Sequence, residues 1–164
     1  MLPIECGEAI EGVDLQARVL AALDLQPGHK VLEIGTGSGY TAAVMSRMVA
    51  RVISLDRYRT LIELASQRLE VLELSNVLLR QADGRQGLAA EGPFDRIVVW
   101  AAYAEHPRHL VDQLSTGGIA VAAIGPAEGE QALARLSKIG SRFEREELGR
   151  VRLQPLAEGM AAAI

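Results

Sequence analysis

Short apolar runs alternate with amphipathic segments along the first three quarters of the chain. Five runs of aliphatic and aromatic residues, bounded by glycine, proline or acidic residues, predict buried strands. These runs are Val31–Ile34, Val52–Leu55, Val77–Leu79, Phe94–Trp100 and Ile119–Ile124. Three segments with apolar residues at helical spacing predict helices. They are Val13–Asp24, Thr41–Val49 and Arg59–Leu74, and a short helix is expected near Pro107. This alternation predicts a mostly parallel sheet with helices on both faces.

The last part of the chain has a different character. Leu133–Ser137 and Glu147–Leu156 alternate only loosely between apolar and charged residues, and Gly140 lies between them. We interpret both segments as strands of a terminal hairpin, with the turn near Gly140. Residues 161–164 are expected to form a frayed end.

Length and composition narrow the class of protein. A chain of 164 residues and 17.6 kDa fits a single domain over residues 1–164. A net charge of −4 argues against a protein that binds nucleic acid through its overall charge. The sequence contains no stretch of 18 apolar residues, and its N-terminus lacks a basic region followed by an apolar run. We therefore expect no membrane span, no secretory signal and a cytoplasmic location. The single cysteine, Cys6, excludes an internal disulfide.

The most informative segment is Val31–Tyr40, which reads VLEIGTGSGY. Gly35, Gly37 and Gly39 lie between a predicted strand and a predicted helix, where a glycine turn lets a ligand approach the backbone. The spacing G-x-G-x-G differs from the G-x-G-x-x-G of dinucleotide-binding proteins. It favours a ligand without a phosphate group, the alternative being an ordinary turn between strand and helix.

Acidic residues follow the predicted strands at the same edge of the sheet. Glu33 precedes the glycines, Asp56 ends the second strand, and Asp83-Gly84 follows the third. A carboxylate at the end of the second strand can accept hydrogen bonds from both ribose hydroxyls. Three carboxylates suit a nucleoside with a positively charged tail, which describes S-adenosylmethionine. Taken singly, each acid is also compatible with a helix cap or a turn.

Five segments carry a resemblance to a known family. They are VLEIGTGSGY at 31–40, ADG at 82–84, PFDRIVVWAA at 93–102, LVDQLSTGGIAVAAIG at 110–125 and FEREELGRVRLQPL at 143–156. With them the chain resembles the protein-L-isoaspartate O-methyltransferase family, which methylates isoaspartyl residues of damaged proteins. The resemblance implies a class I methyltransferase fold: a Rossmann-like, three-layer α/β sandwich with a mostly parallel sheet and an antiparallel C-terminal strand. It also implies S-adenosylmethionine as the cofactor.

The resemblance assigns the cofactor-binding residues. It implies that six residues line the methionine and ribose region of the cofactor, namely Glu33, Gly35, Thr36, Gly37, Ser38 and Gly39. Asp56 is expected on the ribose hydroxyls, Arg57 beside the adenine, and Asp83 with Gly84 on the amino edge of the adenine.

The N-terminal region departs from the family. The family has a longer segment before the glycine loop, and it reads G-H-G-Q-T-I-S-Q-P where this chain has residues 5–13. Glu11 therefore stands where the family has the serine associated with the reacting carboxylate. Two unit charges about 4 Å apart repel by roughly 4 kcal/mol at an effective dielectric constant of about 20. An isoaspartyl carboxylate thus requires Glu11 to be protonated or turned away.

Two other functions stay open at this point. In the first, the methyl acceptor is a small amine or hydroxyl compound, and Glu11 is the catalytic general base. In the second, the chain is a non-catalytic homologue that binds the cofactor or a partner protein. Glu11 and its acidic neighbours are also compatible with a solvated acidic face.

The remaining candidates concern the acceptor. Ile10, Glu11, Trp100 and Tyr103 are expected to line a substrate pocket, with core packing as the alternative for the two aromatic residues. His106 and His109 lack a recognisable third ligand, so no metal site is predicted. We expect a peptide, protein or small-molecule substrate, and neither nucleic acid nor membrane as a partner; the oligomeric state stays open.

Overall fold

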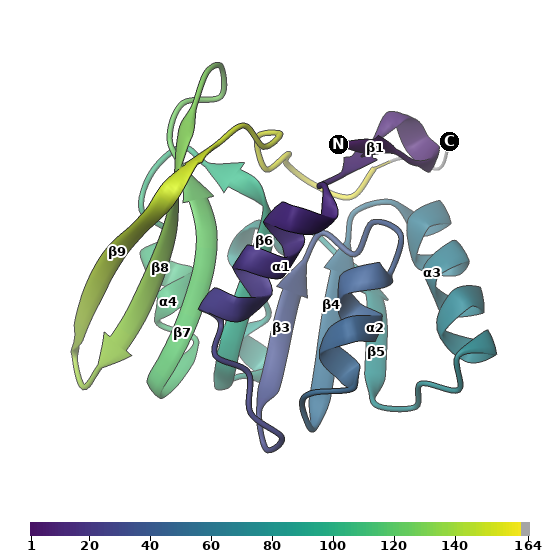
Figure 1. The fold of residues 1–164 in the computed structure, drawn as a ribbon, viewed down its shortest axis with the longest axis horizontal. Coiled ribbons are helices and arrows are strands. Elements are labelled where there is room, and N and C mark those ends of the chain that lie inside the picture. The colour runs from purple at the N-terminus through teal and green to yellow at the C-terminus, as the bar shows by residue number, and fades with distance from the viewer. Residues whose placement is uncertain (162–164) are drawn as a thin grey trace.

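The computed structural model describes residues 1–161, so of the frayed end predicted for residues 161–164 all but Ala161 lies outside the described residues. Its centre is a seven-stranded sheet in the order β5-β4-β3-β6-β7-β8-β9 (Figure 1). The strands are β3 (Lys30–Ile34), β4 (Arg51–Asp56), β5 (Val77–Gln81), β6 (Phe94–Tyr103), β7 (Leu114–Ile124), β8 (Gln131–Ile139) and β9 (Arg142–Val151). The first five pair in parallel, which confirms the predicted class of sheet. A two-residue ladder joins β1 (Leu2–Pro3) to β2 (Ala9–Ile10) near the N-terminus.

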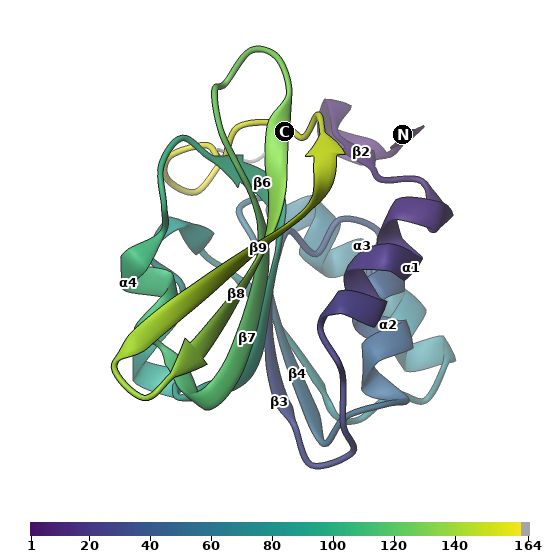
Figure 2. The ribbon, with the colours of Figure 1, turned by 60° about the vertical axis from the view of Figure 1, so that its left-hand side comes forward.

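The helices pack on both faces of the sheet, as predicted. They are α1 (Val13–Ala22), α2 (Tyr40–Ser46), α3 (Arg59–Val71) and the short α4 (Arg108–Val111). Figure 2 shows α1 and α2 on one face and α4 on the other. Within residues 1–161, none of the helices combines the length and the apolar character that crossing a membrane requires.

Three helices end earlier than their apolar patterns predict. Helix α1 was expected to reach Asp24, but it ends at Ala22, because Asp24 has a φ of 48°, in the left-handed region that ends a helix. Helix α2 was expected to reach Val49, but its last turn tightens, because Met48 N donates to Met45 O at 2.8 Å. Helix α3 was expected to reach Leu74, but Glu73 has a φ of 53°, in the left-handed region that ends a helix.

Side chains of the central strands alternate between two apolar layers. Val31 and Val52 are fully buried toward α1 and α2, whereas Leu32 and Ile53 are fully buried in the layer that contains Leu110 of α4. This alternation follows from the two-residue period of a strand, and it explains why the parallel strands read as continuous apolar runs.

The predicted C-terminal hairpin is present, with different bounds. Strand β8 runs antiparallel to β7, and β9 returns along the edge of the sheet. The second strand was expected over Glu147–Leu156, but it covers Arg142–Val151. Beyond it the chain crosses to the end of β6, where Ala102 N donates to Gln154 O and Leu156 N donates to Ala102 O. Figure 1 shows this segment passing over the carboxyl ends of the strands.

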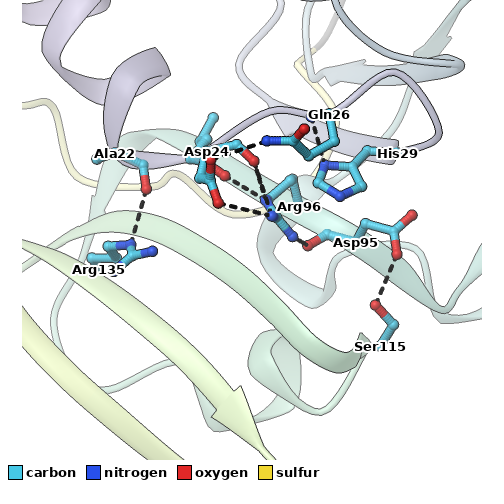
Figure 3. Close-up of polar contacts among 9 residues, drawn as sticks. Ala22, Asp24, Gln26, His29, Asp95, Arg96, Ser115 and Arg135 are labelled. Atoms are coloured by element: carbon cyan, nitrogen blue, oxygen red, sulfur yellow. Dashed lines mark hydrogen bonds and ion pairs between the residues drawn. The ribbon is translucent and has the colours of Figure 1, made fainter.

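Two arginines from the sheet hold the C-terminal end of α1 (Figure 3). Arg96 of β6 is buried and donates to Leu23 O and, at 2.9 Å, to Asp24 O. Arg135 of β8 donates to Ala22 O at 3.0 Å. The last carbonyls of a helix lack partners within the helix, and cations are favoured there. These bonds therefore fix α1 to the sheet at the end opposite to its N-terminus.

We expect Arg96→Met to lower the free energy of unfolding by about 2–4 kcal/mol, because it leaves buried carbonyls without donors. Urea unfolding followed by circular dichroism measures the change. Arg51→Met, at an exposed position of β4, is the matched control and is expected to stay within about 0.5 kcal/mol of the unmodified chain. Equal unfolding midpoints for the two variants would contradict a stabilising role of Arg96.

Candidate functional site

A cavity opens at the carboxyl ends of β3, β4 and β6. Six segments contribute to its lining: the N-terminal residues before α1, the glycine loop after β3, the turn after β4, the turn after β5, the end of β6, and the segment after β9. The structure brings ten of the predicted site residues to this cavity, namely Ile10, Glu11, Gly35, Thr36, Gly37, Ser38, Asp56, Arg57, Gly84 and Trp100. The cavity is therefore at the edge of the sheet where ligands of open α/β folds bind.

The glycine loop is bonded to the end of β4 and packed against two cavity residues. Gly35 N donates to Leu55 O at 2.8 Å, and Gly37 N donates to the Asp56 carboxylate at 3.0 Å. A Cβ atom on Gly35 would lie 3.1 Å from Trp100 Cβ, and one on Gly37 would lie 2.9 Å from Ile10 Cγ2. Both glycines also have positive φ angles. Each position therefore favours glycine for two reasons, the lack of space for a Cβ atom and the backbone conformation.

Gly39 lies outside the cavity lining. It precedes α2 with a φ of 81°, and a Cβ atom there would lie 2.9 Å from Ala65 Cβ on α3. The third glycine therefore allows α2 and α3 to pack closely, whereas it was expected to line the methionine and ribose region of the cofactor.

Glu33 is also outside the cavity lining, contrary to expectation. Its carboxylate is fully buried and accepts hydrogen bonds from Thr41 Oγ1 at 2.5 Å, Ser54 Oγ at 2.6 Å and Trp100 Nε1 at 2.9 Å. Because side chains alternate along β3, Glu33 points to the face of Val31, between the sheet and α2. Burial raises the pKa of Glu33, and the three donated bonds oppose that rise.

Asp56 lies in the cavity lining, as predicted. One carboxylate oxygen accepts from Tyr58 N and the other from Gly37 N, both at 3.0 Å. Burial raises the pKa of Asp56, with the two backbone bonds acting in the opposite direction. Each carboxylate oxygen has two lone pairs, so both retain the capacity to accept one further hydrogen bond.

Arg57 lies next to Asp56 and also lines the cavity. Its guanidinium carbon is 5.4 Å from the centre of the Tyr58 ring. Within residues 1–161 its Nε atom is buried and has no hydrogen-bond partner. A buried donor without a partner is costly, and here it points to a group that a ligand satisfies.

Asp83 does not reach the cavity lining, although Gly84 does. The Asp83 carboxylate accepts from Arg85 N at 3.0 Å and from Gly159 N at 2.8 Å, and it pairs with the Arg85 side chain. Partial burial acts to raise the pKa of Asp83, but these partners lower it overall. Asp83 thus caps a turn and holds the C-terminal segment in place.

Tyr103 was expected to line the substrate pocket, but the structure does not bring it to the cavity lining. Its hydroxyl donates to Arg85 O at 3.0 Å, and its ring packs edge-on against His109. Trp100 and Tyr103 are three residues apart on β6, so they point to opposite faces of the sheet. Trp100 packs with the layer of α1, and Tyr103 packs with the layer of α4.

Several cavity residues were missed from sequence. They include Glu8, Gln16, Tyr58 and the segment from Gln154 to Ala157. Gln16 carried a signal, since it is a polar residue within an apolar helical pattern; it is 5% exposed and donates to Glu11 O at 2.8 Å. The C-terminal residues carried none, because tertiary contacts bring them to the cavity, among them the pairing with Ala102 and the bond from Gly159 N to Asp83.

Comparisons with a family model and with individual proteins point to the same family. A family model for Protein-L-isoaspartate(D-aspartate) O-methyltransferase (PCMT) matches residues 1–161. The chain is 47% identical over 148 residues to the protein-L-isoaspartate O-methyltransferase of Rhizobium meliloti (strain 1021), which covers 90% of this chain and 72% of the relative.

Solved structures share the fold. One protein-L-isoaspartate O-methyltransferase superposes with a TM-score of 0.85 at 27% identity, covering 98% of this chain and 52% of that one, so this chain spans about half of its length. The beta-aspartate methyltransferase (PCMT) of Plasmodium falciparum, solved with S-adenosyl-L-homocysteine, superposes with a TM-score of 0.79 at 24% identity, covering 95% and 79% of the two chains. These likenesses confirm the predicted Rossmann-like fold.

We expect Glu33→Leu to lower the free energy of unfolding by at least about 3 kcal/mol, because three buried donors lose their acceptor. Chemical unfolding measures the change. Glu33→Gln keeps an acceptor oxygen and is expected to cost less. Glu63→Leu, on the exposed side of α3, is the control and is expected to change stability by about 0.5 kcal/mol or less. A Glu33→Leu variant as stable as the control would exclude a structural role for this carboxylate.

Proposed function

The chain belongs to the protein-L-isoaspartate(D-aspartate) O-methyltransferase family, and we propose that it transfers the methyl group of S-adenosylmethionine to the free carboxylate of an isoaspartyl residue in a peptide or protein. The observation that carries this proposal is the arrangement around Asp56. Its two carboxylate oxygens are each held by one backbone N–H group and border the same cavity as the glycine loop.

The cavity residues fit such a cofactor. Asp56 can accept from two vicinal ribose hydroxyls, and the unpartnered Nε of Arg57 lies at the same side of the cavity. Trp100 and Ile10 occupy the space that side chains at positions 35 and 37 would need, and the loop between them lines the cavity with Gly35, Thr36, Gly37 and Ser38. We therefore assign Asp56 and Arg57 to the nucleoside, and Gly35, Thr36, Gly37 and Ser38 to the methionine part.

When bound, S-adenosylmethionine supplies an electrophilic methyl group on a sulfonium ion. The protein contributes mainly orientation, because a carboxylate nucleophile is already ionised and requires no general base. Trp100 and Ile10 form walls on either side of the glycine loop, and the segment with Glu11 lies beside Ile10. These residues exclude water and direct the acceptor toward the cofactor.

The activity is tested with methyl-labelled S-adenosylmethionine and an isoaspartyl peptide. We expect label in the peptide as a base-labile methyl ester, together with cofactor binding measured in the same sample. The same peptide with ordinary aspartate is the matched control and should remain unlabelled. Bound cofactor with an unlabelled isoaspartyl peptide would contradict the proposed acceptor and favour a different one.

Asp56→Asn tests the cofactor assignment. We expect the dissociation constant for S-adenosylhomocysteine to rise about 10- to 100-fold, because a hydrogen bond to a charged group is worth about 1.5–3 kcal/mol. Isothermal titration calorimetry measures the affinity. Asp112→Asn, an exposed aspartate far from the cavity lining, is the control. Unchanged affinity in the Asp56 variant would refute the ribose assignment.

A further inference from the structure

Glu11 is fixed at the substrate end of the cavity. Its half-buried side chain lines the cavity, and the neighbouring Ile10 packs on Gly37 of the glycine loop. Its backbone is held from α1, because Gln16 Nε2 donates to Glu11 O at 2.8 Å. Gln16 is 5% exposed, and α1 is anchored to the sheet at its other end by Arg96 and Arg135. The Glu11 backbone is therefore held from both sides and is not free to move away from the cavity.

The surroundings of Glu11 are poor in positive charge. The cavity contains Glu8 from the same segment and Asp56 and Arg57 from the turn after β4. The ion pairs found within residues 1–161 do not include Glu11. Burial raises the pKa of Glu11, and the amino group of Met1 acts in the opposite direction. Among the described residues, a second negative charge beside Glu11 meets two positive groups at the site, Arg57 and the amino group of Met1, and neither forms an ion pair with Glu11.

An isoaspartyl substrate brings that second charge. Two ionised carboxylates about 4 Å apart repel by roughly 4 kcal/mol at an effective dielectric constant of about 20. If the two carboxylates share one proton, the repulsion is replaced by a short O–H···O hydrogen bond from the carboxylic acid to the carboxylate. Hydrogen bonds of this kind, with an ionised acceptor, are among the strong hydrogen bonds of proteins. Paired carboxylates in active sites hold a proton for this reason.

Resting on the proposed function, we propose that Glu11 binds the isoaspartyl carboxylate as a carboxylic acid, donating its proton to one substrate oxygen while the other oxygen accepts the methyl group. A bond forms between this second oxygen and the methyl carbon, and the bond from that carbon to sulfur breaks with its electron pair on sulfur. The proton stays on Glu11, which then donates to the carbonyl oxygen of the ester. Protonated Glu11 thus selects a carboxylate as the acceptor.

The pH dependence of kcat/KM for an isoaspartyl peptide tests this proposal. The active form carries the Glu11 proton, so activity is present below the pKa of Glu11 in the complex and falls about tenfold per pH unit above it. Glu11→Gln keeps a hydrogen-bond donor that does not titrate. We expect this variant to lose the alkaline fall and to exceed the unmodified enzyme at high pH. Glu5→Gln, exposed and outside the cavity lining, should keep the alkaline fall.

Three other results are informative. A flat profile from about pH 5 to about pH 9 in both proteins would overturn the role of the Glu11 proton and leave the proposed function intact. Activity that rises with pH and is lost in Glu11→Gln would show an ionised general base, which also overturns the proposal. If neither protein labels the peptide at any pH while both bind S-adenosylhomocysteine, the proposed function itself fails.

Discussion

The fold of the site depends on one buried carboxylate. Glu33 of β3 receives hydrogen bonds from α2, β4 and β6 through Thr41, Ser54 and Trp100. These donors belong to the elements that flank the glycine loop, and the loop begins one residue after β3 ends. A buried acceptor that satisfies three donors fixes their relative positions, because any displacement leaves a polar group without a partner. The glycine loop thus has a rigid base below the cavity.

Helix α1 fixes the other side of the cavity by a different means. Arg96 and Arg135 hold its last carbonyls against the sheet, and Gln16 near its first turn holds the backbone of Glu11. A helix is stiff along its axis, so anchoring one end constrains the residues before the other. The loop that carries Glu11 is short and irregular, and it owes its position to this helix together with the contact of Ile10 with Gly37.

The sequence was sufficient for the parts of the fold that depend on local patterns. Strands, helices and the parallel sheet followed from periodicity, and Asp56 was expected at the cavity, where it lies, because parallel strands end at a common edge. Glu33 and Tyr103 lie outside the cavity lining, because proximity to that edge does not decide which face a strand residue points to. The Asp83 carboxylate is bonded to Gly159 N, a partner that is distant in the chain. Contacts of that kind, including those of residues 154–157, depend on tertiary structure.

The charges of the cavity impose a final constraint on its chemistry. A net positive cofactor is favoured by Asp56 and Glu8, and among the described residues Arg57 is the one positive side chain of the cavity lining. An anionic acceptor must enter the same partly dehydrated space, where each uncompensated charge is costly. The cation of the cofactor attracts the acceptor, but an ionised Glu11 would cancel that attraction at the point where the carboxylate has to stop. In the proposed mechanism, protonation of Glu11 lets one cavity hold both ligands, because it removes a charge and adds a donor at the same atom.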